Sequence, residues 1–225
     1  MTPTMLSTLS LFALVTLTRA VPVVQLDPWG DDSIRIRIAP TGSPIVNPPL
    51  MALESSTPPT PTSSSVVRAG ALRLTNGNLQ VDVDAVTGLV TAKRVNDGAL
   101  LLRQIATAFG AAATGSRPGS VSVQITFAGT AGEAIYGLGE HRTGTVNQMP
   151  YTQIFQNSQY YPDSHGSDVS IPYYSSSLGY GFLWNLPSYG YVNISEAEIS
   201  WFSNATLNAG LCDQCMAGQW IVLLK

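Results

Sequence analysis

The sequence predicts an all-β protein, and a β-sandwich is the architecture it favours. Many short segments alternate hydrophobic and polar residues at a period of two, which is typical of half-buried strands. Turns rich in Gly, Pro and Asn separate these segments. Only residues 100–113 resemble a helix, and they lack clear capping residues. A closed barrel is the alternative arrangement of the same strands.

The chain begins with a predicted secretory signal over residues 1–20. Residues 6–17 form an apolar run of about a dozen residues, too short to span a bilayer comfortably. Thr18 and Ala20 supply small residues for cleavage before Val21. A buried strand is the alternative. We favour the signal and therefore expect a secreted or secretory-pathway protein. No other segment is long and apolar enough for a span, so no membrane partner is expected.

The first predicted strand covers residues 33–38, where isoleucine alternates with serine or arginine. The composition then changes, because seven of the fifteen prolines fall between Pro40 and Pro61. Proline removes backbone donors and favours extended, solvated chain. Residues 40–65 are therefore predicted to be a Pro/Ser-rich loop or linker.

Dense strand signals begin at Ala71. Asn76 and Gly77 predict a two-residue hairpin turn, because both tolerate positive φ. Thr87 and Gly88 predict a second turn. Alternating apolar residues predict strands at 79–83 and 121–127, and residues 89–92 are the strand that returns after the second turn. Aromatic and branched residues predict further strands at 171–174, 180–184 and 191–194.

The composition argues against nucleic acid as a partner. The net charge is -3, the isoelectric point is near 5.2, and no basic patch is present. Only 11% of the residues are charged, so polarity comes from neutral side chains beside nine Tyr and four Trp. Neutral polar groups next to aromatic rings suit carbohydrates, although a β protein with polar loops has the same composition.

Two tripeptides, beginning at Asn193 and Asn204, are acceptor sequences for N-glycosylation. The two cysteines, Cys212 and Cys215, form no disulfide framework and predict free thiols or one small loop disulfide. With so few cysteines and histidines, we expect no metal site and no cofactor.

Residues 134–141 (AIYGLGEH) are the most specific segment of the sequence. They resemble the signature near the end of the N-terminal domain of family 31 glycoside hydrolases, which include α-glucosidases and α-xylosidases. Residues 170–174 (SIPYY) and 179–185 (GYGFLWN) are similar to a strand pair that follows in that family. Upstream similarity at 34–38 and 75–94 extends the resemblance from about Ser33 to Ala209.

The resemblance implies a sandwich of galactose-mutarotase type, joined in the family to a (β/α)₈ barrel that carries two catalytic aspartates. Retaining hydrolysis needs two carboxylates about 5 Å apart across one sugar. The sequence has no βα alternation and nothing similar to the family's nucleophile segment, so it resembles a chain truncated before the barrel. We expect the carbohydrate-binding-side domain of an α-glucoside- or α-xyloside-cleaving enzyme, with no catalytic residue of its own.

Two other functions stay open. One is a stand-alone, lectin-like carbohydrate-binding protein. The other is an aldose mutarotase-like epimerase, which needs an acid and a base facing one sugar. Glu140 with His141 or His165 supplies such groups only if the fold brings them together, and neighbours on a strand point to opposite faces. We therefore favour a structural hydrogen-bonding role for Glu140.

Other motif residues have structural interpretations. Gly137 and Gly139 leave one face of a strand without side chains, which suits close approach of another backbone or ligand, or a β-bulge. Tyr174, Tyr180 and Trp184 are predicted to lie in the core rather than to form a sugar platform.

Residues 155–167 form a predicted long polar loop, and such loops on rigid β scaffolds commonly carry function. The matching loop of the family resembles one that lines the sugar site near the scissile bond. Asn157, Tyr161 and Asp163 are accordingly the expected substrate-binding residues. A surface loop that only covers the sandwich edge is the alternative.

The C-terminal tail departs from the family. After a domain predicted to span 21–209, an aromatic strand leading to the barrel is expected, whereas residues 210–225 (GLCDQCMAGQWIVLLK) resemble nothing in it. A truncated gene prediction or a short isoform explains such a tail. A foreign tail predicts an unpaired strand edge, or an exposed apolar end at residues 221–224.

Overall fold

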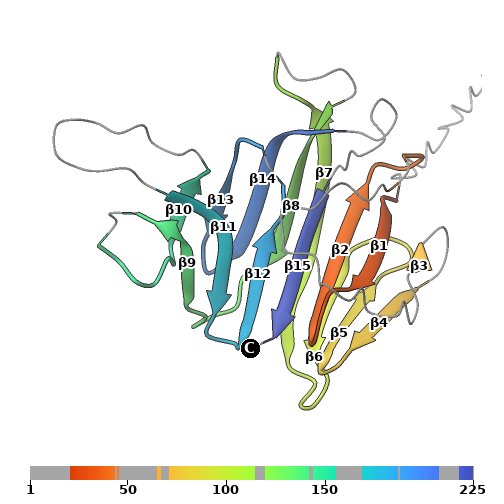
Figure 1. The fold of residues 1–225 in the computed structure, drawn as a ribbon, viewed down its shortest axis with the longest axis horizontal. Coiled ribbons are helices and arrows are strands. Elements are labelled where there is room, and N and C mark those ends of the chain that lie inside the picture. Colours follow the sequence, from red (N-terminus) through yellow and green to blue (C-terminus); the bar gives the residue numbers. More distant parts are fainter. Residues whose placement is uncertain are drawn as a thin grey trace, which may run out of the picture.

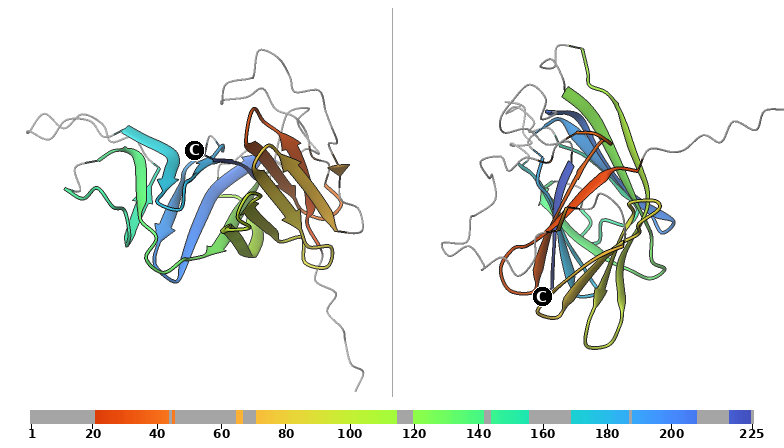
Figure 2. Two further views of the ribbon diagram at one scale, coloured as in Figure 1. Left: turned by 90° about the horizontal axis from the view of Figure 1, so that it is seen from below. Right: turned by 90° about the vertical axis from the view of Figure 1, so that its right-hand side faces the viewer.

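The computed structural model describes residues 21–43, 45, 65–66, 71–114, 120–141, 144–155, 169–186, 188–207 and 218–224; of 65–66, 205–207 and 218 it describes only the backbone. Within this part of the chain, all regular elements are β-strands. They form two antiparallel sheets stacked as two layers (Figures 1 and 2). The predicted all-β sandwich is therefore confirmed, and the sheets do not close into one barrel.

We call the seven-stranded layer sheet I. Its strands are antiparallel throughout, and strands distant in sequence lie side by side. Their spatial order is β3 (Ser65–Val66), β1 (Val23–Pro28), β2 (Ser33–Ala39), β15 (Gly218–Leu224), β12 (Tyr180–Trp184), β11 (Val169–Ser176) and β9 (Ile135–Glu140).

We call the eight-stranded layer sheet II. It contains the long central strands of the molecule, again paired antiparallel. Its order is β10 (Tyr151–Ile154), β13 (Gly190–Ile194), β14 (Glu198–Leu207), β8 (Ser120–Ala128), β7 (Leu100–Ala111), β6 (Val90–Arg94), β5 (Leu79–Val83) and β4 (Leu72–Asn76).

The core lies between the facing sides of the two sheets. Alternation along each strand places every second side chain in this layer. Stacked and edge-to-face aromatic rings from both sheets fill its centre, including Trp184, Trp201 and Trp220, each at most 1% exposed. Tyr174 and Tyr180 are also fully buried, which confirms the prediction that these tyrosines and Trp184 are core residues.

The predicted hairpin is present between β4 and β5, but its turn lies one residue later. Asn76 still pairs with Leu79, and Gly77 and Asn78 are the two loop residues. Gly77 has a φ of 56°, so a glycine opens the turn, as in the hairpin turn whose first central position favours Gly. Any side chain at Gly77 would also collide with Asp32.

Residues 100–111 form strand β7, although residues 100–113 resemble a helix in sequence. β7 pairs with β6 on one side and with β8 on the other, so its backbone groups are bonded within the sheet. Leu101 and Leu102 are buried, and the buried Gln104 side chain accepts a hydrogen bond from the Val90 amide at 3.0 Å. Pairing with the neighbouring strands on both sides thus overrides the helix propensity of Leu, Ala, Arg and Gln.

The tail contributes strand β15, which lies inside sheet I between β2 and β12 (Figure 1). Trp220 pairs with Ile36 on one side and with Trp184 on the other. Ile221 and Val222 are at most 2% exposed. The expectation of an unpaired edge or an exposed apolar end is therefore wrong, because this segment pairs along both of its edges and buries its apolar residues in the core.

Candidate functional site

The signature strand β9 has an unusual backbone. Gly137, Leu138 and Gly139 all have positive φ, of 122°, 71° and 109°. A left-handed conformation at a non-glycine residue such as Leu138 costs roughly 1–2 kcal/mol. Burial of its side chain among the core residues offsets that cost.

Both glycines of the signature let strand β11 approach closely. A Cβ atom on Gly137 would lie 2.8 Å from the Tyr173 carbonyl oxygen, and one on Gly139 would overlap the carbonyl oxygen of Val169. The pairing of β11 with β9 shifts register between Ser170 and Tyr174. The predicted close backbone approach and the predicted bulge are therefore both present at this point.

Glu140 and His141 do not form an acid–base pair at a shared site. Glu140 is exposed at the end of β9, opposite Val169. His141 is half-buried, and its Nε2 donates to the Leu138 carbonyl oxygen at 3.0 Å. The structural hydrogen-bonding role of Glu140 stays a prediction. His165 lies outside the described residues.

A different carboxylate occupies the buried position near the signature. Glu133 is 4% exposed and accepts hydrogen bonds from Ser176 Oγ at 2.5 Å and from the Tyr180 hydroxyl at 2.8 Å. The hydroxyls of Tyr174 and Tyr180 lie 3.3 Å apart. Burial raises the pKa of both tyrosines well above the ordinary value, and the charge on Glu133 raises it further. No motif in the sequence marked Glu133, because its two hydrogen-bond partners lie 43 and 47 residues further along the chain.

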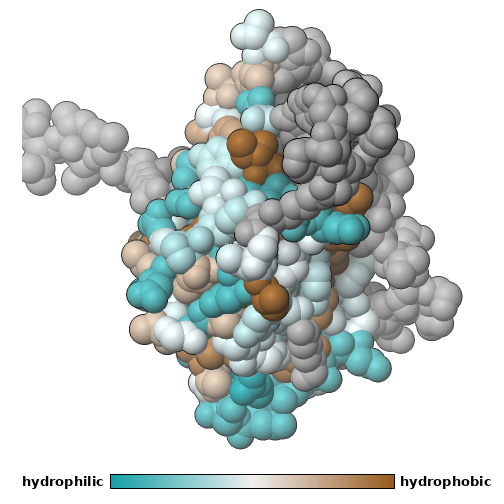
Figure 3. All heavy atoms as spheres, turned by 90° about the vertical axis from the view of Figure 1, so that its left-hand side faces the viewer, coloured by the Kyte–Doolittle hydropathy of each residue, from teal (hydrophilic) through white to brown (hydrophobic). Residues whose placement is uncertain are grey.

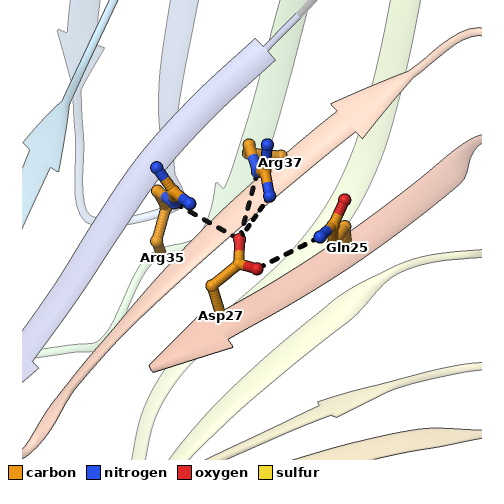
Figure 4. A network of polar contacts seen from close by, with 4 residues as sticks. All are labelled: Gln25, Asp27, Arg35 and Arg37. Atoms are coloured by element: carbon orange, nitrogen blue, oxygen red, sulfur yellow. Dashed lines mark hydrogen bonds and ion pairs between the residues drawn. The ribbon is translucent and has the colours of Figure 1, made fainter. Parts of the chain in front are cut away.

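A second buried polar network lies on the outer face of sheet I (Figure 4). Asp27 accepts hydrogen bonds from Arg37 at 2.8 Å, from Arg35 at 3.3 Å and from Gln25 at 3.1 Å. The Arg35 guanidinium also lies 4.5 Å above the Trp29 ring. The sequence predicted a half-buried strand here, but both arginines are at most 6% exposed. Pairing with Asp27 makes their burial tolerable.

The predicted substrate-binding residues Asn157, Tyr161 and Asp163 lie outside the described residues, so their role stays a prediction. The described residues on either side are well anchored. Phe155 stacks on Trp201 with ring centroids 5.4 Å apart, and its amide donates to the Gly190 carbonyl. The predicted loop therefore starts beside sheet II and ends at strand β11 of sheet I.

The end of the sandwich that carries this loop exposes several hydrophobic side chains. Figure 3 shows this end as separate hydrophobic patches among hydrophilic and neutral atoms. Six exposed large hydrophobic residues come from the strands here and the turns next to them: Tyr136, Val146, Ile154, Val169, Ile171 and Tyr189.

The two glycosylation sequons differ in accessibility. Asn193 is exposed on β13, and its Oδ1 accepts a hydrogen bond from Thr152 at 2.9 Å. Asn204 is half-buried in β14, where the pairing with β8 shifts register. Cys212 and Cys215 lie outside the described residues. In the described part of the chain, no cluster of His, Cys, Asp or Glu side chains could hold a metal, and no helix could cross a membrane.

The geometry defines a class of protein, a two-layer antiparallel sandwich with a glycine-dependent bulge at its signature strand. Residues 23–193 match the family model of the glycosyl hydrolase 31 N-terminal galactose mutarotase-like domain. The chain belongs to this family.

One curated protein and two solved structures are similar to this chain. An uncharacterized family 31 glucosidase of Pseudescherichia vulneris is 27% identical over 207 residues, covering 82% of this chain and 36% of that protein. A xylosidase from Aspergillus niger has a TM-score of 0.66 at 20% identity, covering 89% of this chain and 28% of its own. An α-xylosidase from a soil metagenome has a TM-score of 0.67 at 22% identity, with 90% and 30% covered. The chain thus spans about a third of these relatives.

Proposed function

We propose that this chain is the carbohydrate-binding-side domain of a retaining α-glycosidase and that it has no glycosidase activity alone. One observation carries this proposal: the chain matches the N-terminal domain over most of its length, while its relatives are about three times as long. In an enzyme of that kind, the remaining length would hold the catalytic barrel, which is the expected partner of the sandwich.

The chemistry of glycoside hydrolysis supports the proposal that the sandwich is not the catalytic part of the enzyme. A retaining enzyme needs two carboxylates about 5 Å apart, both free to face one sugar ring. In the sandwich, the buried carboxylates serve other groups. Glu133 accepts hydrogen bonds from two side-chain hydroxyls, and Asp27 pairs with two arginines. These bonds stabilise the strands and leave the carboxylates poorly placed for proton transfer.

The proposed substrate is an α-glucoside or an α-xyloside, contacted through residues 155–167. Several relatives are xylosidases, and one was solved with xylose bound. The loop begins and ends at well-anchored strands of different sheets, so a rigid scaffold would present its polar side chains. Amide and carboxylate groups at Asn157 and Asp163 suit sugar hydroxyls, and the Tyr161 ring suits a sugar face.

An assay with aryl α-glucosides and aryl α-xylosides tests the proposal. The purified chain should give no turnover above buffer, while a full-length family member assayed in parallel should be active. Loss of both catalytic carboxylates forfeits an acceleration on the order of a millionfold or more. Turnover that survives purification and disappears in Glu140→Ala or Asp163→Ala would contradict it.

A binding measurement separates the domain of an enzyme from a lectin-like protein. Calorimetric titration of the isolated chain with xylose and with isomaltotriose should show no saturable heat, because half of the proposed sugar site would come from the barrel. Saturable binding by the chain alone would favour the stand-alone carbohydrate-binding function instead.

We also propose that the protein enters the secretory pathway through residues 1–20. The short apolar run and the two sequons support this proposal. Mass spectrometry of protein secreted from a eukaryotic host should find a mature N-terminus at Val21. An intact Met1 in protein that stays inside the cell would refute it.

A further inference from the structure

The outer face of sheet II carries an aromatic pair beside the Asn193 sequon. Tyr191 on β13 pairs with Phe202 on β14, and their rings stack with centroids 5.1 Å apart. Both rings are half-buried, although they point away from the core, where Val192 and Trp201 are fully buried. Each ring therefore presents part of its surface to solvent.

Asn193 lies on the same face, two residues after Tyr191. Because side chains alternate along a strand, the two side chains project together, about 7 Å apart along β13. Asn193 pairs regularly with Thr152 on one side and with Ser200 on the other. The Thr152 hydroxyl donates a hydrogen bond to Oδ1 of Asn193, so this bond does not involve Nδ2. Nδ2 is the atom that carries the sugar in an N-linked glycan.

Asn204 also follows an aromatic residue, Phe202, by two positions, but its surroundings differ. It is half-buried and stands where the pairing of β14 with β8 becomes irregular. Its backbone amide donates to the Tyr189 carbonyl at 2.9 Å, so the adjacent turn is held against it. A bulky glycan fits an exposed, regularly paired position better than this one.

We propose that Asn193 is the N-glycosylated residue of this protein and that the first sugar of its glycan packs on the Tyr191 ring. In this step, an oligosaccharide moves from a polyprenyl diphosphate donor to Nδ2. The C1–N bond forms, the C1–O bond to phosphate breaks, and Nδ2 loses one proton as the lipid diphosphate leaves. The oxygen Oδ1 keeps its hydrogen bond from Thr152 throughout.

The ring explains why this attachment stabilises the sandwich. A pyranose has an apolar face of C–H groups, and these groups carry partial positive charge that complements the negative face of an aromatic ring. The Phe202 ring, stacked behind Tyr191, limits the motion of the tyrosine and widens the apolar platform. Packing a sugar there removes exposed aromatic surface from water.

The inference rests on entry into the secretory pathway, so the test supplies that entry. The chain would be expressed in a eukaryotic host behind the host's own signal peptide, with Asn193→Gln and Asn204→Gln as matched variants. Mass spectrometry of glycopeptides should find glycan on Asn193 in the parent and in Asn204→Gln, and none in Asn193→Gln. Glycan on Asn204 with Asn193 empty would overturn the proposal.

A second measurement tests the packing itself. The parent protein would be trimmed with an endoglycosidase that leaves one N-acetylglucosamine on Asn193. Its thermal unfolding would be compared with that of the Asn193→Gln protein, which carries no sugar at this position. The single sugar should raise Tm by about 2–4 °C, which is the shift expected of a modest stabilisation in a domain of this size.

The same comparison in a Tyr191→Ala background should show no gain, whereas Tyr136→Ala, an exposed aromatic on the other sheet, should leave the gain unchanged. A gain that persists in Tyr191→Ala would overturn the packing. These outcomes involve no added sugar substrate, so they are independent of the glycosidase proposal.

Discussion

At the residue scale, the Glu133 carboxylate connects the turn before β9 to strands β11 and β12. It accepts one hydrogen bond from Ser176 and one from Tyr180 in a buried site. Removing the carboxylate leaves both hydroxyls without this acceptor, and unmet buried donors are costly. The turn before β9 and the β11–β12 hairpin, more than 40 residues further along the chain, are therefore joined through one side chain.

Glu133→Ala should lower the free energy of unfolding by about 2–3 kcal/mol, because the hydrogen bonds to a charged acceptor are lost. Urea denaturation followed by tryptophan fluorescence measures this change. The exposed Glu196 is the control, since Glu196→Ala should stay within about 0.5 kcal/mol of the parent. Equal effects of the two substitutions would show that Glu133 contributes little.

The buried tyrosines predict alkaline sensitivity. Tyr174 and Tyr180 have raised pKa values because burial disfavours the charged phenolate. The folded state therefore holds these protons more tightly than the unfolded state, whose tyrosines titrate near 10. Stability is fully present below about pH 10 and falls as pH rises above it, by about 1.4 kcal/mol per pH unit for each tyrosine.

Urea midpoints measured at pH 8, 10 and 11 test this sign. The parent should lose stability between pH 10 and 11, and Tyr174→Phe should lose less over the same interval. Tyr189 is 51% exposed, so Tyr189→Phe should follow the parent. A Tyr174→Phe curve that matches the parent would mean that other groups govern alkaline unfolding.

The signature glycines give the sharpest substitution test. Gly139→Ala should destabilise the protein by about 3 kcal/mol or more, because the new Cβ overlaps the Val169 carbonyl and β11 must shift. Gly132 also has positive φ, but nothing lies within 4 Å of the position that a Cβ atom would take there. Gly132→Ala should therefore lower the free energy of unfolding by only about 1 kcal/mol, which is the cost of holding alanine in the left-handed conformation. Similar losses at both sites would remove the close approach as the reason for the signature.

At the element scale, strand β15 completes sheet I. It pairs with β2 along one edge and with β12 along the other, so its loss would expose two strand edges and the inner aromatic layer. Deletion of residues 218–225 should abolish cooperative unfolding and give aggregated protein. Deletion of residues 1–20, the control, should leave cooperative unfolding intact. A soluble, cooperatively folding deletion of β15 would show that the other strands suffice.

Within β15, Gln219 is an imperfect residue for its position. Its side chain is fully buried opposite Arg37, and neither its amide oxygen nor its amide nitrogen has a hydrogen-bond partner. Replacement by an apolar residue of similar length removes that unmet polarity. Gln219→Met should therefore raise the free energy of unfolding by about 1 kcal/mol. A clear loss of stability would indicate that the amide interacts with the arginine network.

At the scale of the whole molecule, the sandwich is a scaffold for the loop between β10 and β11. Grafted into a full-length family member, Asn157→Ala, Tyr161→Ala or Asp163→Ala should raise KM or lower kcat about tenfold, which is about 1.4 kcal/mol each. Asn193→Ala in the same graft should leave both constants unchanged, because Asn193 lies on the outer face of sheet II. Unchanged KM and kcat in all three loop variants would contradict substrate binding and would favour a surface loop that only covers the edge of the sandwich.

The sequence by itself determined the strands whose pattern is local. Strands β2, β5 and β8 follow from period-two alternation, and β12 and β13 follow from their aromatic and branched residues. The turns at Gly77 and Gly88 follow from residues that tolerate positive φ. The signature glycines also indicated a bulge before any partner strand was known. These features depend on residues that are neighbours in sequence, so the amino-acid sequence alone suffices to predict them.

Only the tertiary structure decided which segments meet. The helix-like residues of β7 form a strand that pairs with both β6 and β8. Residues 218–224 form a strand that pairs with both β2 and β12 in sheet I. The burial of Arg35 and Glu133 likewise depends on partners from other strands. Pairing and burial are long-range properties, whereas alternation reports only that one face of a strand is apolar.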